Sequence, residues 1–316
     1  MTNQVDISFN HVTKRFSDVV AVNDLSLDIM NGETFGLLGP NGAGKTTTLN
    51  LLAGLLQSDG GTIHIAEYSL PKDITHARSL MGFCPQEISS IAYLTGVENA
   101  RLFGTLNGLR GDALRARITR IFDDLKLTDK AKKRVSTYSG GMKRRLNLIL
   151  AILHEPAIII LDEPTAGLDP QTRRVVWDYI RSFKAAGKTI VLTTHYIEEA
   201  DELCDRVGII DNGKIIALDT PRKLKEQLVA TEEFEFTLPP ATSLPQENFS
   251  GLDYVVNCTF NASNGVAKVQ TKRGIPHLNE LLAHLPRGIN LEGLHIREFN
   301  LEDLFIQLTG REIRVE

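Results

Sequence analysis

Residues 37–50 read "LLGPNGAGKTTTLN", and this stretch decides the fold of the chain. The spacing Gly39-x-x-x-x-Gly44-Lys45-Thr46 matches the phosphate-binding pattern G-x-x-x-x-G-K-[ST]. Glycines let the backbone approach a ligand closely, so that successive N–H groups converge on phosphate oxygens. "ETFGLLG" before the loop predicts a short buried strand, and "TTTLNLLAGLL" after it predicts a helix. The stretch therefore indicates a nucleotide site at a strand-to-helix turn.

Each part of this loop has an expected task. Lys45 can place its ammonium between the β- and γ-phosphates, and Thr46 can offer its hydroxyl to Mg²⁺. The following helix turns its positive N-terminal end toward the anion. The predicted cradle consists of Gly39, Pro40, Asn41, Gly42, Ala43, Gly44, Lys45, Thr46 and Thr47.

Composition narrows the class of protein without naming a function. The chain has 316 residues, of which 42% are hydrophobic and 23% charged, and this predicts a soluble protein of about two domains. The net charge of -4 gives no reason to expect a nucleic-acid partner. The first residues lack the pattern of a signal peptide, and no apolar run approaches the ~18 residues that span a bilayer. We therefore expect the chain on the cytoplasmic side of any membrane, with Cys84, Cys204 and Cys258 as buried free thiols.

The pattern of strands and helices predicts an α/β fold up to about residue 230. Residues 5–16, 20–33 and 60–70 alternate apolar and polar residues, which predicts antiparallel strands. Residues 157–164 and 188–195 are instead continuous apolar runs, which are typical of parallel strands buried on both faces. A mostly helical block, roughly residues 93–153, interrupts this core.

Residues 231–316 form a second predicted domain, small and α+β in class. Three prolines lead into strand-like runs, two helices and a surplus of acidic residues. It carries no phosphate loop, metal spacing or nucleophile arrangement, so we expect regulation or dimer support from it. Its last helix has an apolar stripe that must pack somewhere, formed by Leu301, Leu304, Phe305 and Leu308.

Polar residues follow the two buried strands where the ligands of parallel sheets bind. Asp162 ends "AIIILD", within expected reach of Mg²⁺. Glu163 comes next, and its carboxylate can accept a hydrogen bond from the water that attacks the γ-phosphate. His195 ends "KTIVLTTH" and is expected to face the nucleotide, while Gln86 offers an amide to Mg²⁺ or to the attacking water.

A second glycine-rich turn, "TYSGGMKRR", opens another predicted helix. Ser139, Gly140 and Gly141 can donate to a phosphate there, together with the N-terminal end of that helix. In one chain this turn and the Lys45 loop belong to different subdomains.

Taken in order, these motifs resemble the nucleotide-binding subunit of an ATP-binding-cassette (ABC) transporter over residues 5 to about 228. "GPNGAGKTT" resembles the family's Walker A, "IIILDEP" its Walker B, "YSGGM" its signature and "GLDP" its D-loop. Gln86 matches the Q-loop and His195 the switch histidine, while Phe16 stands where the family stacks an aromatic ring on adenine. Tyr138 and Met142 depart from the commoner signature LSGGQ. This variant and the ending "LEDLFIQLTGRE" resemble exporters of drugs, lipids or polysaccharides.

The resemblance implies a P-loop NTPase (RecA-like) core with an antiparallel β subdomain and a helical subdomain. It further implies an ATPase that binds ATP and Mg²⁺ in a head-to-tail homodimer, each ATP lying between Walker A of one chain and the signature of the other. A transmembrane permease subunit would hold the chain at the cytoplasmic face of the cell membrane, touching residues 86–109. A soluble ABC ATPase with a non-transport role and an ATP-gated regulatory protein are the alternatives.

Overall fold

The structure is a computed structural model, and it describes residues 4–237, 249, 251–261, 265–272, 275–284 and 294–310. The described chain divides into two compact units, residues 4–220 and 221–310. The proline-rich stretch predicted to lead into the second domain lies mostly outside the described residues. Each unit is described in turn.

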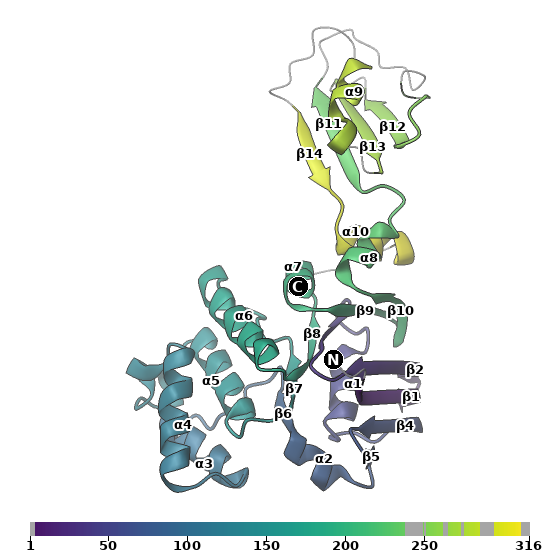
Figure 1. The fold of residues 1–316 in the computed structure, drawn as a ribbon. Coiled ribbons are helices and arrows are strands. Elements are labelled where there is room, and N and C mark those ends of the chain that lie inside the picture. The colour runs from purple at the N-terminus through teal and green to yellow at the C-terminus, as the bar shows by residue number, and fades with distance from the viewer. Residues whose placement is uncertain are drawn as a thin grey trace. The chain divides into compact units, whose positions relative to one another are not determined.

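A six-stranded sheet forms the centre of the first unit (Figure 1). Its strands lie in the order β10 (Lys214–Asp219), β9 (Arg206–Asp211), β3 (Thr34–Leu38), β8 (Thr189–Thr194), β7 (Ile158–Asp162) and β6 (Met81–Cys84). All neighbours pair in parallel except β9 and β10. Every residue of β3, β7 and β8 is buried, which explains their continuous apolar sequences.

The second sheet of this unit is antiparallel, as the alternating sequences predict. Its order is β2 (Val19–Met30), β1 (Val5–Phe16), β4 (Gly60–Ile65) and β5 (Tyr68–Leu70). Side chains from this sheet, β3 and the helix of the phosphate loop share one apolar core, in which Ile7, Phe35 and Leu49 are almost fully buried. The core fixes the loop between the two sheets.

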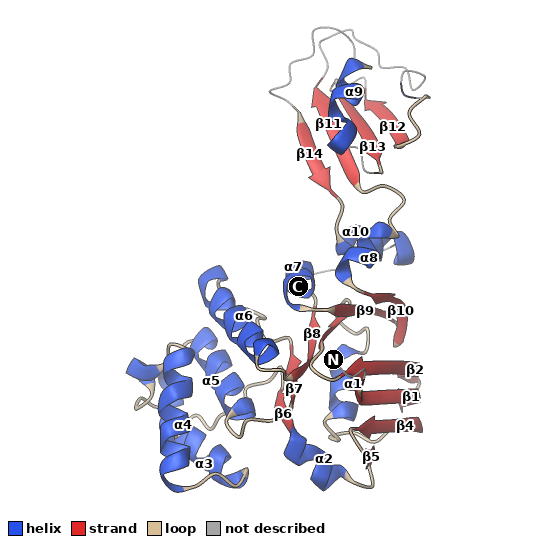
Figure 2. Ribbon diagram, in the orientation of Figure 1, coloured by secondary structure: helices blue, strands red, loops and turns tan. Residues whose placement is uncertain are grey.

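Helices flank the sheets of the first unit (Figure 2). They are α1 (Lys45–Leu52), α2 (Ile74–Leu80), α3 (Gly96–Leu106), α4 (Gly111–Asp124), α5 (Gly140–Ile152), α6 (Pro170–Ala185) and α7 (Ile197–Leu203), with single 3-10 turns η1 (Thr128–Lys130) and η2 (Val135–Thr137). Helices α3, α4 and α5 lie in the predicted helical block. The predicted α/β fold with antiparallel and helical parts is confirmed.

The second unit contains a four-stranded antiparallel sheet in the order β12, β13, β11, β14. Its elements are α8 (Pro221–Glu226), β11 (Glu232–Thr237), β12 (Val255–Asn261), β13 (Val266–Thr271), η4 (Ile275–His277), α9 (Leu278–Ala283), β14 (His295–Glu298) and α10 (Leu301–Thr309). Within this unit α10 packs on α8, so the division falls after Thr220 and not at the expected residue 230. Three residues of the predicted α10 stripe are buried, whereas Leu308 is 44% exposed.

Two further expectations concern the whole chain. The three cysteines are buried thiols that form no disulfide with one another, as predicted, and burial raises the pKa of each thiol, that of Cys84 to about 11. Among the described helices, none is both long and apolar enough to span a bilayer.

Candidate functional site

The phosphate loop joins β3 to α1, and its glycines are required by close backbone approaches. Gly44 has φ of +105°, and a Cβ there would lie 2.3 Å from the carbonyl oxygen of Ala21. At Gly39 a Cβ would lie 2.3 Å from the carbonyl oxygen of Ile210. Any side chain at these positions would push the loop away from the sheets, so the pattern of bare backbone is a packing requirement as well as a ligand requirement.

Lys45 is the first residue of α1 and is only 5% exposed. Its Nζ donates to the carbonyl oxygens of Gly39 at 2.7 Å and Pro40 at 3.1 Å, and lies 3.4 Å from Glu163 Oε1. Burial lowers the pKa of Lys45, and the nearby Glu163 carboxylate acts in the opposite direction. A buried ammonium held at the mouth of a loop suits an incoming phosphate, which would supply further negative charge.

Asp162 ends β7 beside the loop, as predicted. Its Oδ1 accepts hydrogen bonds from Thr193 Oγ1 at 2.5 Å and from Thr46 Oγ1 at 3.3 Å. Burial raises the pKa of the Asp162 carboxyl, while these two hydroxyl groups favour its ionised form. A hydroxyl and a carboxylate are thus brought together from two elements far apart in the sequence.

Glu163 follows β7 with a left-handed backbone, at φ of +47°. Few residues other than glycine adopt this conformation, and such strain is concentrated at functional sites. The N–H of Glu163 donates to Thr193 Oγ1 at 3.0 Å, and Gln86 Nε2 donates to Glu163 Oε2 at 3.4 Å. His195 Nδ1 lies 3.2 Å from Glu163 Oε1, yet it has no partner with hydrogen-bond geometry among the described residues.

Most of these side chains line one cavity of about 600 Å³. Most of the predicted cradle lines it, together with Gln86, Glu163 and His195, whereas Gly39 and Ala43 lie behind its wall. Asp162 is buried behind the wall as well, at 1% exposure. Gly167, the first residue of the predicted D-loop, also lines the cavity. The sequence did not single out the remaining lining residues, which are Val19, Val20, Ala21, Ala166, Tyr196 and Asn212.

Two groups of predicted residues lie outside this cavity. Phe16 ends β1 and is 46% exposed, with Lys14 Nζ 5.5 Å from its ring centre. Residues 139–141 begin α5, where the exposed Ser139 caps the helix by accepting a hydrogen bond from the N–H of Met142. The structure therefore does not bring these groups together with Lys45.

Tyr138, one of the two departures from the commoner signature, is buried for a structural reason. Its hydroxyl donates to the carbonyl oxygen of Lys130 at 2.7 Å, and its side chain is 5% exposed. This hydrogen bond joins the residue before Ser139 to the segment that follows α4. Tyrosine at position 138 therefore stabilises the helical part of the unit, and Ser139 stays exposed at the start of α5.

Sequence reasoning missed Arg144 of α5, which contacts the backbone beside the cavity. Its buried guanidinium donates to five backbone carbonyl oxygens, which belong to Pro85, Gln86, Asp162, Glu163 and Pro164. One side chain thus fixes the backbone on both sides of the cavity floor. Lys143 and Arg145 flank Arg144 in the sequence, so no local pattern distinguishes it from its neighbours. Its burial and its carbonyl partners become evident only in the structure.

Replacing Arg144 with Lys should weaken both folding and turnover. An ammonium has three donors on a flexible stem and cannot reproduce the planar fork, so some buried carbonyl groups lose their partner. We expect the free energy of unfolding to fall by about 2–4 kcal/mol in denaturant titrations, and kcat to fall more than the KM for ATP changes. The matched control is Arg145→Lys, since Arg145 bonds only carbonyl groups at the turn after α4 and its own helix. Equal kcat values for Arg144→Lys and wild type would contradict this positioning role.

The residues of the cavity fit a nucleoside triphosphate with one Mg²⁺. Glycine backbone and a buried ammonium suit phosphate oxygens, and His195 lines the same cavity. Mg²⁺ prefers oxygen ligands, and proteins bind it through one or two side chains plus substrate phosphates. The pair formed by Thr46 and Asp162 matches that demand.

Comparisons with known proteins identify the family of this chain. Residues 22–166 match the family model described as ABC transporter. The chain is 40% identical to the Nod factor export ATP-binding protein I of Burkholderia lata, and the match covers 98% of each chain. It is 35% identical to the linearmycin resistance ATP-binding protein of Bacillus subtilis, with 96% of this chain and 98% of the relative covered.

Solved structures give the same family. A dimeric ATP-binding cassette in a post-hydrolysis state with ADP and Pi is 26% identical, with a TM-score of 0.63 over 68% of this chain and 98% of the other. An ATP-binding subunit of an ABC transporter is 28% identical, with a TM-score of 0.65 over 70% and 92%. The resemblance inferred from the motifs is confirmed. The chain belongs to the ABC transporter family, as an ATP-binding and ATP-hydrolysing subunit.

Proposed function

We propose that this ATPase powers export through a separate transmembrane subunit and works as a head-to-tail dimer. The observation that carries the dimer is the separation of Ser139 from the cavity that Lys45 lines. A second chain turned end to end could place its own α5 over the open cavity. The relatives named as export and resistance proteins support export, and the solved cassette that is dimeric supports the assembly.

The chemistry proposed for the site is hydrolysis of the γ-phosphate of ATP. Lys45 and the loop backbone would hold the phosphates, and Ser139 to Gly141 of the partner chain would hold them from the other side. Mg²⁺, held by Thr46, Asp162 and Gln86, would offset the phosphate charge. Glu163 would accept a hydrogen bond from the attacking water, and His195 would donate to the γ-phosphate.

The loss of the γ-phosphate provides the proposed coupling to transport. With ATP present, contacts from both chains converge on the same phosphates and hold the dimer closed. After hydrolysis these contacts are lost and the dimer loosens, as in other phosphate-dependent switches. A membrane partner docked on each chain would receive this movement.

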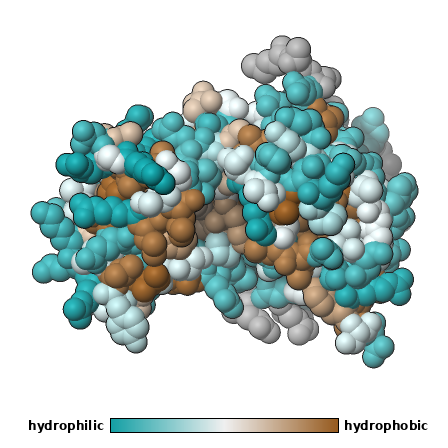
Figure 3. All heavy atoms as spheres, turned by 90° about the horizontal axis from the view of Figure 1, so that it is seen from below, coloured by the Kyte–Doolittle hydropathy of each residue, from teal (hydrophilic) through white to brown (hydrophobic). Residues whose placement is uncertain are grey.

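Residues 86–109 are the proposed docking surface for the permease at the cytoplasmic face of the membrane. Exposed apolar side chains are concentrated there: Ile88, Ile91, Tyr93, Leu102 and Leu106, of which Tyr93 is 83% exposed. Seen from the side of α2 and α3, apolar side chains gather in patches around a hollow in the surface (Figure 3). Exposed apolar patches of this kind mark interaction sites.

Replacing Ser139 with Phe tests the head-to-tail arrangement. The exposed side chain would block the approach of the partner's ATP, so we expect the ATPase rate to fall about 100-fold, while ATP affinity changes little. Phosphate release and binding of a fluorescent ATP analogue measure the two effects. Ser79→Phe on the exposed side of α2 is the matched control. Full ATPase activity of Ser139→Phe would refute the arrangement.

We also propose that Phe16 contacts the adenine ring. It lies at the end of β1, next in sequence to the strand residues Val19–Ala21 that line the cavity, and Lys14 stands over its ring. Stacking reads the face of a base and discriminates weakly between ATP and GTP. We expect Phe16→Ala to weaken ATP binding about three- to tenfold, measured by titration of a fluorescent analogue. An unchanged Kd would remove Phe16 from the site.

For the second unit we propose regulation or dimer support. Acidic side chains on β11 face basic and polar partners on β13, as in the pairs of Lys268 Nζ with Glu233 and Glu235. The buried stripe of α10 is used within the unit, because α10 packs on α8. Leu308 is the part of the stripe left exposed for a second copy.

A further inference from the structure

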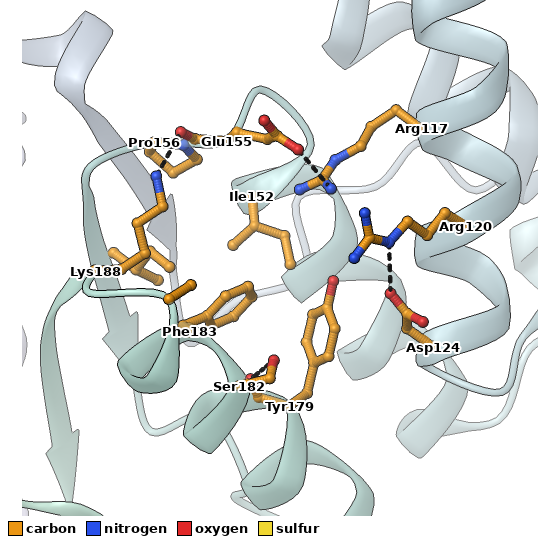
Figure 4. Close-up of a pocket in the computed structure, with 12 residues that line it drawn as sticks. Arg117, Arg120, Asp124, Ile152, Glu155, Pro156, Tyr179, Ser182, Phe183 and Lys188 are labelled. Carbon is orange, nitrogen blue, oxygen red and sulfur yellow. Dashed lines mark hydrogen bonds and ion pairs between the residues drawn. The ribbon is translucent and has the colours of Figure 1, made fainter.

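A second cavity, of about 320 Å³, lies in the first unit between the helical part and the core (Figure 4). Its walls come from α4, the turn between α5 and β7, and α6 with the turn that follows it. No residue of this cavity also lines the nucleotide cavity. Its lining residues are Arg117, Arg120, Asp124, Ile152, Glu155, Pro156, Ile159, Tyr179, Ser182, Phe183, Ala186 and Lys188.

The floor of this cavity is apolar. Ile152 and Ile159 are almost fully buried. The rings of Tyr179 and Phe183 pack edge to face, with 4.6 Å between their centres, and form one wall. Such a surface suits a flat aromatic or aliphatic body, and the volume lies at the lower end of the range for small-molecule sites.

The rim of the cavity carries charge, with three basic side chains against two acidic ones. Arg117 pairs with Glu155 at 2.7 Å, and Lys188 donates to the carbonyl oxygen of Glu155 at 3.2 Å. Arg120 Nε is 3.9 Å from Asp124 Oδ2, beyond hydrogen-bond distance. Asp124 therefore does not engage the guanidinium of Arg120 in a hydrogen bond, and the N–H groups of that guanidinium can donate to a new anionic partner.

Helix ends and side chains make opposite contributions to the charge of the rim. Helices α5 and α6 both end at the cavity, and each C-terminal end carries about half a negative charge. Arg117 Nε is directed to the carbonyl oxygen of Leu153, at the end of α5, and offsets that end. Three basic and two acidic side chains leave one net positive charge on the rim, and the guanidinium N–H groups of Arg120 can donate to an anion there.

Tyr179 adds a neutral donor to this setting. Burial raises the pKa of its phenol to about 12, so the hydroxyl keeps its proton at neutral pH. In Figure 4 the hydroxyl lies between Ile152 and Arg120, facing the cavity. It can donate a hydrogen bond to a ligand oxygen beside the Arg120 guanidinium.

We propose that this cavity binds a small amphipathic molecule with an aromatic or aliphatic body and one anionic group. The body lies on the apolar floor, and the anion meets Arg120 and the Tyr179 hydroxyl. The cavity lies at the C-terminal ends of α5 and α6. The N-terminal end of α5 carries the signature residues, and α6 begins at the end of the D-loop. Bound ligand would therefore brace both helices at the ends away from the nucleotide.

The test uses 8-anilinonaphthalene-1-sulfonate, an aromatic body with one sulfonate, titrated calorimetrically into the full chain with excess ADP present. We expect one saturable site. Ser182 is exposed and lines the cavity, so Ser182→Trp should fill it and weaken binding at least about tenfold. Ala185→Trp, three residues on, is exposed and outside the lining, and should bind as wild type does. Equal affinity of Ser182→Trp and wild type would overturn the site.

A second pair of variants tests the anionic part. Arg120→Gln should weaken the sulfonate probe about three- to tenfold, whereas Arg115→Gln, on the same helix but outside the cavity, should not. The uncharged analogue N-phenyl-1-naphthylamine should bind equally to wild type and Arg120→Gln. Loss of both probes in Arg120→Gln, or of neither, would contradict the proposed anion contact. None of these titrations depends on ATP hydrolysis.

Discussion

The Glu163→Gln variant should bind ATP as wild type does and hydrolyse it about 10²- to 10⁴-fold more slowly. The amide has the same size and keeps a hydrogen-bond acceptor toward Gln86, but it cannot orient water as a carboxylate does. Both side chains share the same Cβ, so the left-handed backbone at this position is equally strained in either variant. The chemical step is therefore affected more than the fold.

Slow hydrolysis in Glu163→Gln should also trap the proposed dimer. Size-exclusion chromatography with Mg-ATP should show a dimer, and the same run without nucleotide should show a monomer. Glu198→Gln on the exposed side of α7 is the matched control and should turn over ATP normally. Rapid turnover by Glu163→Gln would remove this carboxylate from the reaction.

Replacing Lys45 with Ala should weaken ATP binding and slow turnover. The substitution removes a buried ammonium beside the loop and leaves the Glu163 carboxylate without its cation at 3.4 Å. A hydrogen bond between charged partners contributes about 1.5–3 kcal/mol, which corresponds to a ten- to about 100-fold loss of affinity. Titration with a fluorescent ATP analogue measures this loss, and phosphate release measures the rate.

Two further variants serve as controls for Lys45→Ala. Lys132→Ala removes an exposed lysine and should leave affinity and rate unchanged. Lys45→Arg keeps the charge but adds bulk at a position that is 5% exposed, so it should not restore wild-type binding. Wild-type affinity of Lys45→Ala would show that the loop backbone alone holds the phosphates.

Local patterns in the sequence were sufficient to predict the layers of the first unit and most of its site. Continuous apolar runs distinguish buried parallel strands from the alternating antiparallel ones, and polar residues at strand ends mark the ligand edge. Asp162, Glu163 and His195 were predicted in this way, and the structure places Glu163 and His195 in the lining of one cavity. The phosphate loop was found because its glycines satisfy a backbone requirement that no other residue type meets.

The misses are long-range contacts that leave no local pattern. Arg144 bonds carbonyl groups of segments that lie about 20 and 60 residues away along the chain, and its neighbour Arg145 is identical in type but reaches neither segment. The division after Thr220 depends on α8 packing on α10, which lies near the far end of the chain. Val19–Ala21 line the nucleotide cavity through sheet packing alone.

The buried thiols have a practical consequence for following this protein at work. A cysteine reacts as an exposed thiolate, and burial of Cys84, Cys204 and Cys258 opposes both exposure and deprotonation. A single cysteine introduced on an exposed face of α5 or α6 would therefore react with a labelling reagent much faster than the three buried thiols. Fluorophores or spin labels can be attached there without first replacing the native residues, which keeps the core packing of the wild-type chain intact.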